Sequence, residues 1–428
     1  YSSHPTCLLS VFSVLSSACR RQQCNSELYF FYKNMLFQLP MDIWYVNLRQ
    51  LRAMAASARL GSITAAAPAG SRTQPASTQA LAKLESQLGH QLFERRPDGM
   101  ARLQAAQMFG PRVEAALAHI ASRRVTMAGV RTLIAVADAG SYAGASTNTG
   151  LAQPTLHRVI RDLSFALKRP LVERRGKGIA ITEQGRRTVR AFRLGVSELA
   201  AGLSELDALD GRETGRISIG AMPLSRARLL PTAVAVFHNE RPDTQTVIVE
   251  GSFRELIEPL RDGVIDVMIG ALRDTSVGDD LVQEPLFVDR LVVLGRNGHP
   301  LSRTDAKPGV AELAHYPWVI SAPGTPLREQ WEQMFPGTTP PRIPIESGSV
   351  LANREILRKS DFLTLLSPDQ VAVELEAGWL VKICEAPGEL ARTIGITTRT
   401  GWRPTAMQQA FLETLRETAM EMTLNKNL

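Results

Sequence analysis

Apolar positions in the N-terminal half of the chain follow a helical spacing that occurs twice. The first set consists of Leu48, Leu51, Met54, Ala55 and Ala58. The second set consists of Val130, Leu133, Ile134, Val136 and Ala137. Residues three and four positions apart lie on one face of a helix, so each set predicts a helix with one buried side.

Glycine and proline residues mark where further helices begin and end. Gly61-Ser62 and Gly140-Ser141 follow the two predicted helices and suit a C-terminal glycine followed by an N-cap serine. Gln74-Pro75 and Gln153-Pro154 then open a longer helix, because proline is tolerated in the first helical turn. Helix, short helix, turn and longer helix is the order of a helix-turn-helix domain.

The two patterns are related by a constant offset of 79 positions. Three landmarks return at this spacing, with Gly61-Ser62, Gln74-Pro75 and Glu94-Arg95-Arg96 reappearing as Gly140-Ser141, Gln153-Pro154 and Glu173-Arg174-Arg175. A spacing shared by three landmarks indicates two copies of one small domain. In the second copy, the basic segment 174–178 and the apolar segment 179–181 predict a two-stranded wing.

A long helix is predicted from Thr182 to about Asp210. This segment has no proline, and its apolar residues form one stripe that consists of Val189, Phe192, Val196, Leu199, Leu203 and Leu206. We expect the stripe to pair with a second subunit, and packing on its own domain is the alternative.

The period changes after the glycine-flanked linker at 211–215. Short β runs alternate with helical stretches, which predicts two βα lobes with parallel sheets. The expected strands of the first lobe are 217–219, 247–249 and 265–269, with helices at 229–238 and 255–262. The second lobe is expected to contain strands at 291–294, 318–321, 343–346, 362–366 and 380–383, with helices at 327–335, 350–359 and 369–377. A strand at 393–397 and a closing helix at 405–420 follow, and crossover strands are expected near 290 and 392.

Basic residues concentrate in the N-terminal half. The chain has 428 residues and a formal net charge of +7, but residues 41–200 carry +13 and residues 201–428 carry −8. This division favours a polyanionic partner for the first part only, and uneven surface charge without a function is the alternative. Three of the four cysteines lie in residues 1–40, so the rest of the chain has no disulfide framework, which fits a reducing compartment.

Residues 1–40 do not share the regular pattern. Their apolar run from Cys7 to Cys19 is similar to the core of a signal peptide, but no basic segment precedes it and regular helical spacing starts only after Met41. We interpret residues 1–40 as a disordered, non-native extension, with a signal peptide as the alternative. No apolar stretch reaches the roughly 20 residues that span a bilayer, so no membrane partner is expected.

The third predicted helix of the second copy carries side chains suited to DNA. A helix fits the major groove, where its N-terminal residues reach base edges, glutamine can pair with adenine and arginine with guanine or phosphate. The candidates on this helix are Gln153, Pro154, Thr155, His157, Arg158 and Arg161. Arg174, Arg175 and Lys177 of the wing are expected to bind backbone phosphates. A solvated basic face without a ligand is the alternative.

These motifs together resemble the LysR-type transcriptional regulators. The matching residues of the second copy are Leu133, Gly140-Ser141-Tyr142, Ala145, Gln153-Pro154-Thr155-Leu156, Arg158, Ile160, Leu163, Leu167, Leu171, Glu173-Arg174 and Thr182-Glu183-Gln184-Gly185. Those of the first copy are Leu51, Gly61-Ser62, Ala66-Ala67, Gln74-Pro75-Ala76, Leu84-Glu85, Leu88-Gly89 and Leu92-Phe93-Glu94-Arg95. The tandem copies and the segment 270–301 resemble the subgroup of galactose-binding-protein regulators.

The resemblance implies an α/β chain with two winged helix-turn-helix domains, a dimerising linker helix and a two-lobed effector domain like a periplasmic binding protein. The expected bounds are 41–124 for the first copy, 125–181 for the second, 182–210 for the linker helix and 214–428 for the effector domain. Lobe I would comprise 214–291 and 392–422, and lobe II 292–391. A cytoplasmic homodimer or homotetramer is implied, which binds double-stranded DNA and a small-molecule effector, a sugar or an organic or aromatic acid.

The first copy departs from the family pattern. Gly70, Arg72 and Ser77 stand where apolar core residues are expected, and Pro68 would break the second helix. Gln79 occupies the position of Arg158, so Gln74 and Gln79 are the first copy's weaker candidates for DNA contact. We predict a degenerate domain, with most DNA reading by the second copy.

Effector contacts are expected where parallel strands end and helices begin. The candidates are Met222, Ser225, Arg226, Ser252, Phe253, Ser321 and Thr325. Ser252 and Ser367 also fit capping boxes with Glu255 and Gln370, so a purely structural role is the alternative for such serines.

Enzyme classes find no support in the motifs. The chain lacks a nucleophile elbow, a zinc-protease motif, a P-loop and a dinucleotide-binding glycine pattern, and its seven histidines are scattered. No metal or cofactor is expected. The alternatives to a DNA-binding regulator are a solute-binding receptor module without DNA-binding activity and, with still less support, an α/β enzyme with a regulatory domain.

Overall fold

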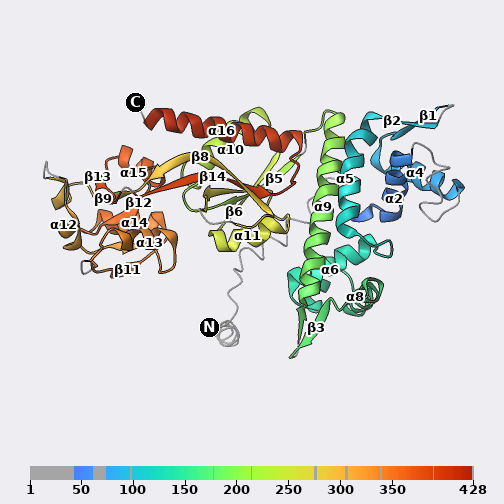
Figure 1. Cartoon of the computed structure of the whole chain (residues 1–428), viewed down its shortest axis with the longest axis horizontal. Coiled ribbons are helices and arrows are strands. Elements are labelled where there is room, and N and C mark those ends of the chain that lie inside the picture. The colour runs from blue at the N-terminus through green and yellow to red at the C-terminus, as the bar shows by residue number, and fades with distance from the viewer. Residues whose placement is uncertain are drawn as a thin grey trace, which may run out of the picture. The chain divides into compact units, whose positions relative to one another are not determined.

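The computed structural model describes residues 43–60, 74–96, 99–176, 178–213, 215–273, 277–303, 307–337, 340–388 and 390–426. The chain divides into two compact units, Tyr1–Leu209 and Asp210–Leu428 (Figure 1). Each unit has its own hydrophobic core.

The first unit consists of helices and two short hairpins. Its elements are η1 (Ile43–Tyr45), α2 (Leu48–Leu60), α4 (Gln74–Leu88), β1 (Phe93–Arg96), β2 (Gly99–Arg102), α5 (Gln104–Ile120), α6 (Met127–Ala139), α7 (Tyr142–Thr149), α8 (Gln153–Leu167), β3 (Val172–Arg175), β4 (Gly178–Ile181) and α9 (Glu183–Leu209). The helix-turn-helix order and the two-stranded wing predicted for the second copy are confirmed.

The turn between α6 and α7 uses the predicted glycine and serine. Gly140 has a φ of 61°, a conformation that favours glycine, and its N–H donates to the carbonyl of Val136 at the end of α6. The hydroxyl of Ser141 accepts from the Gly144 N–H at 3.0 Å and caps α7. The corresponding turn of the first copy, with Gly61-Ser62, Pro68, Gly70 and Arg72, lies outside the described residues.

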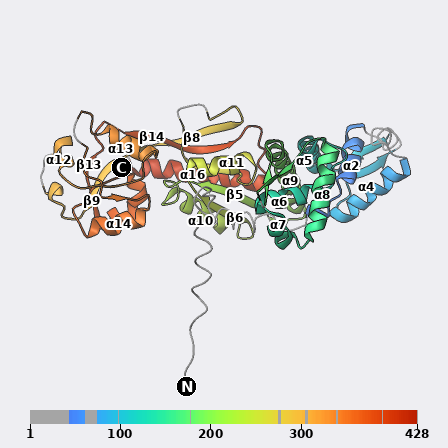
Figure 2. The same ribbon diagram turned by 90° about the horizontal axis from the view of Figure 1, so that it is seen from below.

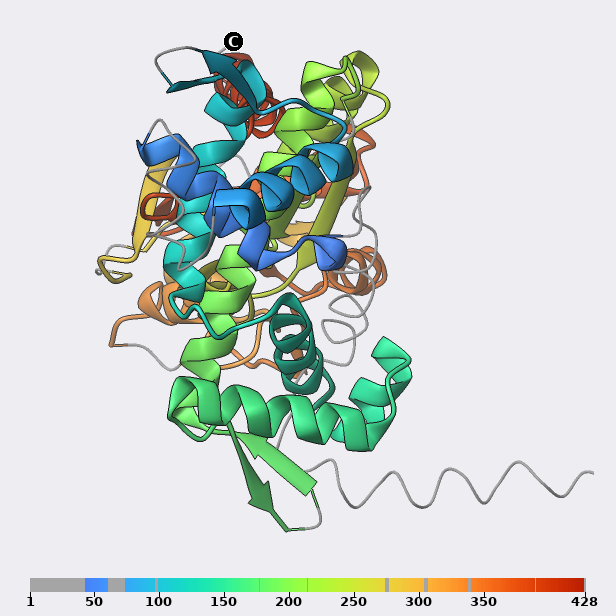
Figure 3. The ribbon, with the colours of Figure 1, turned by 90° about the vertical axis from the view of Figure 1, so that its right-hand side faces the viewer.

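One face of α8 is held in the core, which leaves its opposite face exposed. Leu156, Ile160 and Leu163 are buried at helical spacing. The wing β3–β4 follows, and its strands pair antiparallel from Val172 with Ile181 to Arg175 with Gly178. Figure 3 shows the wing as two green arrows that project beyond the helices.

The long helix α9 is covered within its own chain. Its predicted stripe, from Val189 to Leu206, is buried in the same core as Phe109, Val113 and Ile120 of α5. The helices run antiparallel, since position 202 lies against Phe109 while position 195 lies against Ala116 and Ile120. The stripe is thus covered within the chain by a long helix of the first copy, which is neither a second subunit nor its own domain, and its pairing with a second subunit stays a prediction.

The second unit alternates strands with helices. Its elements are β5 (Arg216–Ala221), α10 (Leu229–Glu240), β6 (Gln245–Glu250), α11 (Phe253–Arg261), β7 (Val267–Ala271), β8 (Leu281–Arg290), β9 (Val292–Arg296), η2 (Pro300–Ser302), α12 (Val310–Ala314), β10 (Val319–Ile320), α13 (Pro326–Gln333), β11 (Ile345–Glu346), α14 (Val350–Arg358), β12 (Thr364–Leu366), η3 (Pro368–Val371), α15 (Ala372–Glu376), β13 (Leu380–Glu385), β14 (Ala391–Arg399) and α16 (Ala406–Lys426).

The larger sheet of this unit has the order β6-β5-β7-β14-β8. Strands β6, β5 and β7 are parallel, but β14 runs antiparallel to both β7 and β8. The expectation of a parallel sheet was therefore wrong for this part. Strand β8 includes the crossover strand expected near 290, but it begins already at Leu281. Helices α10 and α16 pack against the sheet in one apolar core, and β8 and β14 run side by side over their whole length (Figure 2).

The smaller lobe contains two short sheets. Strands β12-β9-β13 form an antiparallel sheet, and β10 pairs with β11 in parallel. Trp318, Trp331 and Phe335 pack edge-on or tilted at its centre, with ring centroids 5.0–5.9 Å apart. The helix expected at 369–377 is instead a 3-10 turn, η3, followed by the short α15.

Candidate nucleic-acid interface

The predicted DNA contacts of the second copy lie on one solvent-facing surface of α8 and the wing. Gln153, Pro154, His157, Arg158 and Arg161 are exposed, and Thr155 is half-buried. The fold thus leaves free the face opposite Leu156 and Ile160. A helix presented in this way can enter a major groove without unfolding.

The cations of this surface are available for phosphate. Within the part of the chain that the structure describes, Arg158, Arg174 and Arg175 have no ion-pair partner and are exposed. Arg161 lies 3.7 Å from Asp162, but both side chains are largely in solvent, where such a pair contributes little. Lys177 lies outside the described residues.

An aromatic contact fixes α8 on α7. The ring of His157 stacks on Tyr142, with centroids 3.6 Å apart and an angle of 26° between the planes. Burial raises the pKa of the Tyr142 phenol, which therefore stays neutral. The sequence predicted His157 only as a DNA contact, whereas the structure shows that its ring also packs α8 against α7.

The first copy presents a less basic helix. Gln74 begins α4, and Gln79 is exposed at the position of Arg158. Lys83 is the only basic residue within α4. Ser77 is buried where the second copy has the buried Leu156, which agrees with the predicted loss of an apolar core residue.

The effector candidates of the first lobe gather at the carboxyl ends of β5, β6 and β7. Arg226, after β5, forms an ion pair with Glu250 at the end of β6. Phe253 lies under the guanidinium of Arg273, which follows β7, with the guanidinium carbon 4.5 Å from the ring centroid. The Ser252 hydroxyl is exposed, while its N–H donates to Glu255 at 2.8 Å as in a capping box.

Two first-lobe candidates, Met222 and Ser225, are buried. Ser225 is fully buried, and its hydroxyl lies 2.9 Å from the Met222 carbonyl and 3.0 Å from the Ile269 carbonyl. Met222 is also buried and packs against Gly270. The Ser225 hydroxyl is thus bonded to backbone carbonyls and closed to solvent, and its role as an effector contact stays a prediction.

Ser321 and Thr325 of the second lobe share a hydrogen bond of 2.7 Å between their hydroxyls. Thr325 also caps α13 by accepting from the Arg328 N–H. Ser321 follows β10, and Glu346 ends the parallel partner β11. These polar groups therefore meet at the carboxyl edge of the two parallel strands, as expected.

A buried polar network joins the two crossover strands β8 and β14, and no sequence motif predicted it. Asp289 of β8, which is 1% exposed, accepts from the Ser367 hydroxyl at 2.5 Å and from Nε of Arg392 at 3.0 Å. Arg392 of β14 also donates to Gln370 of η3 at 3.3 Å. The adjacent charged residues Asp289 and Arg290 interrupt an apolar run, and this is the sequence signal that could have indicated the network.

Three segments of the chain match models of one family. Residues 48–106 and 127–186 match the bacterial regulatory helix-turn-helix protein of the lysR family, and residues 210–420 match the LysR substrate binding domain. The chain belongs to the LysR family of transcriptional regulators. It is a DNA-binding regulator with an effector-binding domain, and this family is not enzymatic.

Two transcriptional regulators are similar to this chain over most of its length. The HTH-type transcriptional regulator GalR of Pseudomonas putida is 31% identical over 396 residues, which cover 89% of this chain and 99% of that protein. PcaQ of Agrobacterium fabrum is 26% identical over 305 residues, which cover 70% of this chain and 97% of that protein. Because the match covers 89% of this chain, each of the two helix-turn-helix copies has a counterpart in GalR.

Solved structures show the same fold. A variant of full-length OxyR from Pseudomonas aeruginosa superposes with a TM-score of 0.52 at 21% identity and covers 69% of this chain and 94% of that chain. LysG of Corynebacterium glutamicum, solved with the effector arginine bound, has a TM-score of 0.50 at 18% identity and covers 69% of this chain and 98% of that one.

No helix in the described part of this regulator is both long and apolar enough to cross a membrane. The same residues contain no cluster of three or more histidine, cysteine or acidic side chains that could hold a metal ion.

Proposed function

We propose that this LysR-family regulator recognises promoter DNA through α8 and its wing. The observation that carries the proposal is a set of exposed cations that have no ion-pair partner among the described residues: Arg158 on the face of α8 opposite its buried residues, and Arg174 and Arg175 on strand β3 of the wing. Arg158 and Gln153 would read base edges, because both can form bidentate hydrogen bonds in the major groove. Arg174 and Arg175 would bind phosphates and contribute affinity more than sequence choice.

The second unit would control DNA binding through a small molecule. Its proposed effector contacts are Arg226, Ser252 and Phe253 in the first lobe and Ser321 and Thr325 in the second. The hydroxyls and the guanidinium suit a sugar or an organic or aromatic acid. The effector would shift an equilibrium between conformations of a cytoplasmic homodimer or homotetramer.

A fluorescence titration with labelled duplex DNA tests the proposal. DNA fragments are first enriched from random sequence by the purified full-length chain. The double variant Gln153→Ala with Arg158→Ala should then lose roughly thirtyfold or more in affinity, because each bidentate base contact contributes about 1–3 kcal/mol. The matched variant Gln79→Ala with Gln74→Ala should lose less, and equal losses would contradict the assignment of α8 as the main reader.

Salt dependence separates this function from a solute-binding receptor without DNA-binding activity. Each phosphate neutralised by the protein lowers the slope of log affinity against log salt by about 0.9. The variant Arg174→Ala with Arg175→Ala should therefore flatten the slope by about two. A parent chain that shows no affinity for any duplex in dilute buffer would favour the receptor.

A further inference from the structure

The helices α5 and α9 are counterparts in the two copies. The offset of 79 positions that relates the copies also relates the first residues of these helices, Gln104 and Glu183. The first unit therefore contains two versions of the same long helix, each attached to its own helix-turn-helix domain.

The two helices pack around a local two-fold axis. A Cβ on Gly195 would lie 3.2 Å from the Ala116 carbonyl oxygen, so these positions are in contact. Ala116 and Gly195 are 79 positions apart, and each is thus the counterpart of the other. In a two-fold interface the residue at the axis meets its own counterpart. The antiparallel α5–α9 pair consequently has the geometry of a dimer interface within one chain.

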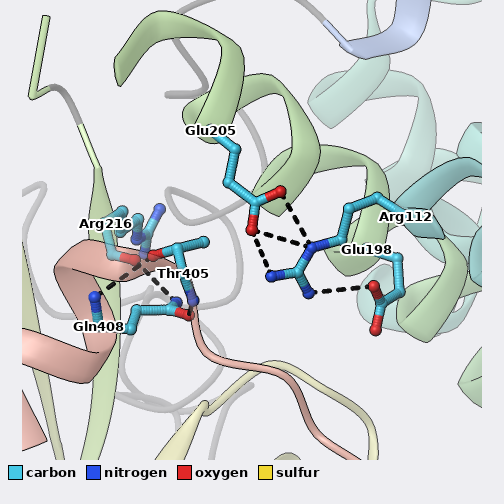
Figure 4. A network of polar contacts seen from close by, with 6 residues as sticks. All are labelled: Arg112, Glu198, Glu205, Arg216, Thr405 and Gln408. Atoms are coloured by element: carbon cyan, nitrogen blue, oxygen red, sulfur yellow. Dashed lines mark hydrogen bonds and ion pairs between the residues drawn. The ribbon is translucent and has the colours of Figure 1, made fainter. Parts of the chain in front are cut away.

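A buried ionic clamp distinguishes this pair from pairs of identical helices. Arg112 of α5 donates to Glu205 at 2.5 Å and to Glu198 at 3.2 Å, both on α9 (Figure 4). The counterpart of Arg112 in α9 is Ala191. Two copies of α9 would bring both glutamates into an interface without this arginine, and two copies of α5 would bring two such arginines without the glutamates. Buried ion pairs of this kind select partners, so the clamp favours α5 with α9.

The two DNA-reading helices lie at opposite ends of the helix pair. In Figures 1 and 3, α4 lies beside the upper part of α5 and α9, while α8 lies at their lower end. Helix α9 has 27 residues, which corresponds to a length of roughly 40 Å. Half-sites of helix-turn-helix dimers are spaced by about 34 Å, one turn of DNA, or by multiples of it.

We propose that a single chain of this regulator is a complete two-headed DNA-binding module that contacts two successive half-sites of one duplex. The second copy reads base edges in one half through α8. The first copy contacts the other half through Gln79 and Lys83 of α4 and Arg102 of its hairpin, which are exposed. The DNA part rests on the proposed function of α8, but the pairing of α5 with α9 in one chain does not.

Disulfide trapping in the full-length chain tests the pairing without DNA. Ala116→Cys and Gly195→Cys are introduced together into a background in which Cys7, Cys19, Cys24 and Cys384 are serine, and the protein is oxidised and analysed on a non-reducing gel. The double variant should give a cross-link within one chain, at the mass of a monomer. Gly195→Cys alone should give no covalent dimer. Covalent dimers from the single variant would show that α9 meets α9 of a second chain and would overturn the proposal.

A charge-swap experiment covers the case in which a cysteine at the crowded position 195 prevents folding. One chain carries Arg112→Glu, a second carries Glu198→Arg and Glu205→Arg, and a third carries all three changes. Hydrogen exchange of α5 should be restored in the third chain and not in a co-expressed mixture of the first two. Equal restoration in the mixture would mean that the helices pair between chains.

Footprinting on an enriched duplex tests the two half-sites. Gln79→Ala with Lys83→Ala should remove protection from one half only, with a loss of affinity of about tenfold. Gln153→Ala with Arg158→Ala should remove protection from both, because the stronger head is lost. An unchanged footprint in the first variant would overturn the role of α4. Absence of any footprint in the parent chain would overturn the DNA-binding function, and the disulfide result would still report the pairing.

Discussion

Truncation of Arg112 isolates the contribution of the buried clamp to the first unit. The Arg112 side chain is 6% exposed, and those of Glu198 and Glu205 are 15% and 16% exposed. Burial alone would lower the pKa of Arg112, but hydrogen bonds and charges of Glu205 and Glu198 outweigh it and raise the pKa. Arg112→Ala removes the guanidinium that two largely buried carboxylates share, and the loss of one partner of a buried ion pair typically costs about 3–5 kcal/mol. Because both glutamates keep some contact with water, we expect about 3 kcal/mol.

Hydrogen exchange followed by mass spectrometry measures this change at the helices themselves. A loss of about 3 kcal/mol should raise the open population of α5 and α9 roughly a hundredfold. Arg186→Ala is a matched control, because its partner Glu183 is on the same helix α9 and both side chains are at least 60% exposed. Arg112→Ala with Glu198→Gln and Glu205→Gln should recover part of the loss, since a neutral amide is less costly to bury than a carboxylate. If Arg112→Ala and Arg186→Ala accelerate exchange equally, the clamp does not hold the helices together.

Three further substitutions have defined outcomes. Gly185→Ala should disrupt the junction between the wing and α9 and lower the melting temperature strongly, because the added Cβ would lie 2.1 Å from the Leu171 carbonyl oxygen. The control Gly110→Ala has open space around the added Cβ and should be neutral or stabilising by up to about 1 kcal/mol. Burial lowers the pKa of His299, so the contribution of this residue to stability is complete above the ordinary value near 6.5 and declines as the pH falls below it. The difference in melting temperature between the parent and His299→Asn should therefore shrink from pH 7.5 to pH 5, as measured by the fluorescence of the buried tryptophans in the same lobe. A constant difference would contradict this. Burial raises the pKa of the Cys384 thiol to about 11, so peptide mapping should show alkylation of Cys384 only in denaturant, and rapid labelling of the native chain at pH 8 would refute its burial.

Local signals predicted the second helix-turn-helix domain well. Gly140 ends α6, Ser141 caps α7 and Pro154 stands in the first turn of α8, so each depends only on residues next to it in the sequence. The buried positions of α8 follow from the helical period alone. The residues of α8 that are not in this buried set form its exposed face, so the face proposed to contact DNA could also be predicted.

Long-range pairing accounts for what the sequence did not reveal. The direction of β14 depends on β7 and β8, and the contact between Asp289 and Arg392 spans 103 positions. The stripe of α9 indicated burial but not the partner, which lies in the other copy. Ser225 shows the same limit at the level of one side chain, because a serine at a strand end can serve a ligand or, as here, two backbone carbonyls.

The local two-fold at Ala116 and Gly195 has an evolutionary consequence. In a homodimer, one codon change alters both reading heads at once, and the operator must stay palindromic. Here each head has its own codons, so one can drift in base preference while the other is held by selection. On the proposal that both helices contact DNA, the neutral α4 and the cationic α8 at opposite ends of the helix pair are such a divergence, and promoters without inverted symmetry would become accessible to the regulator.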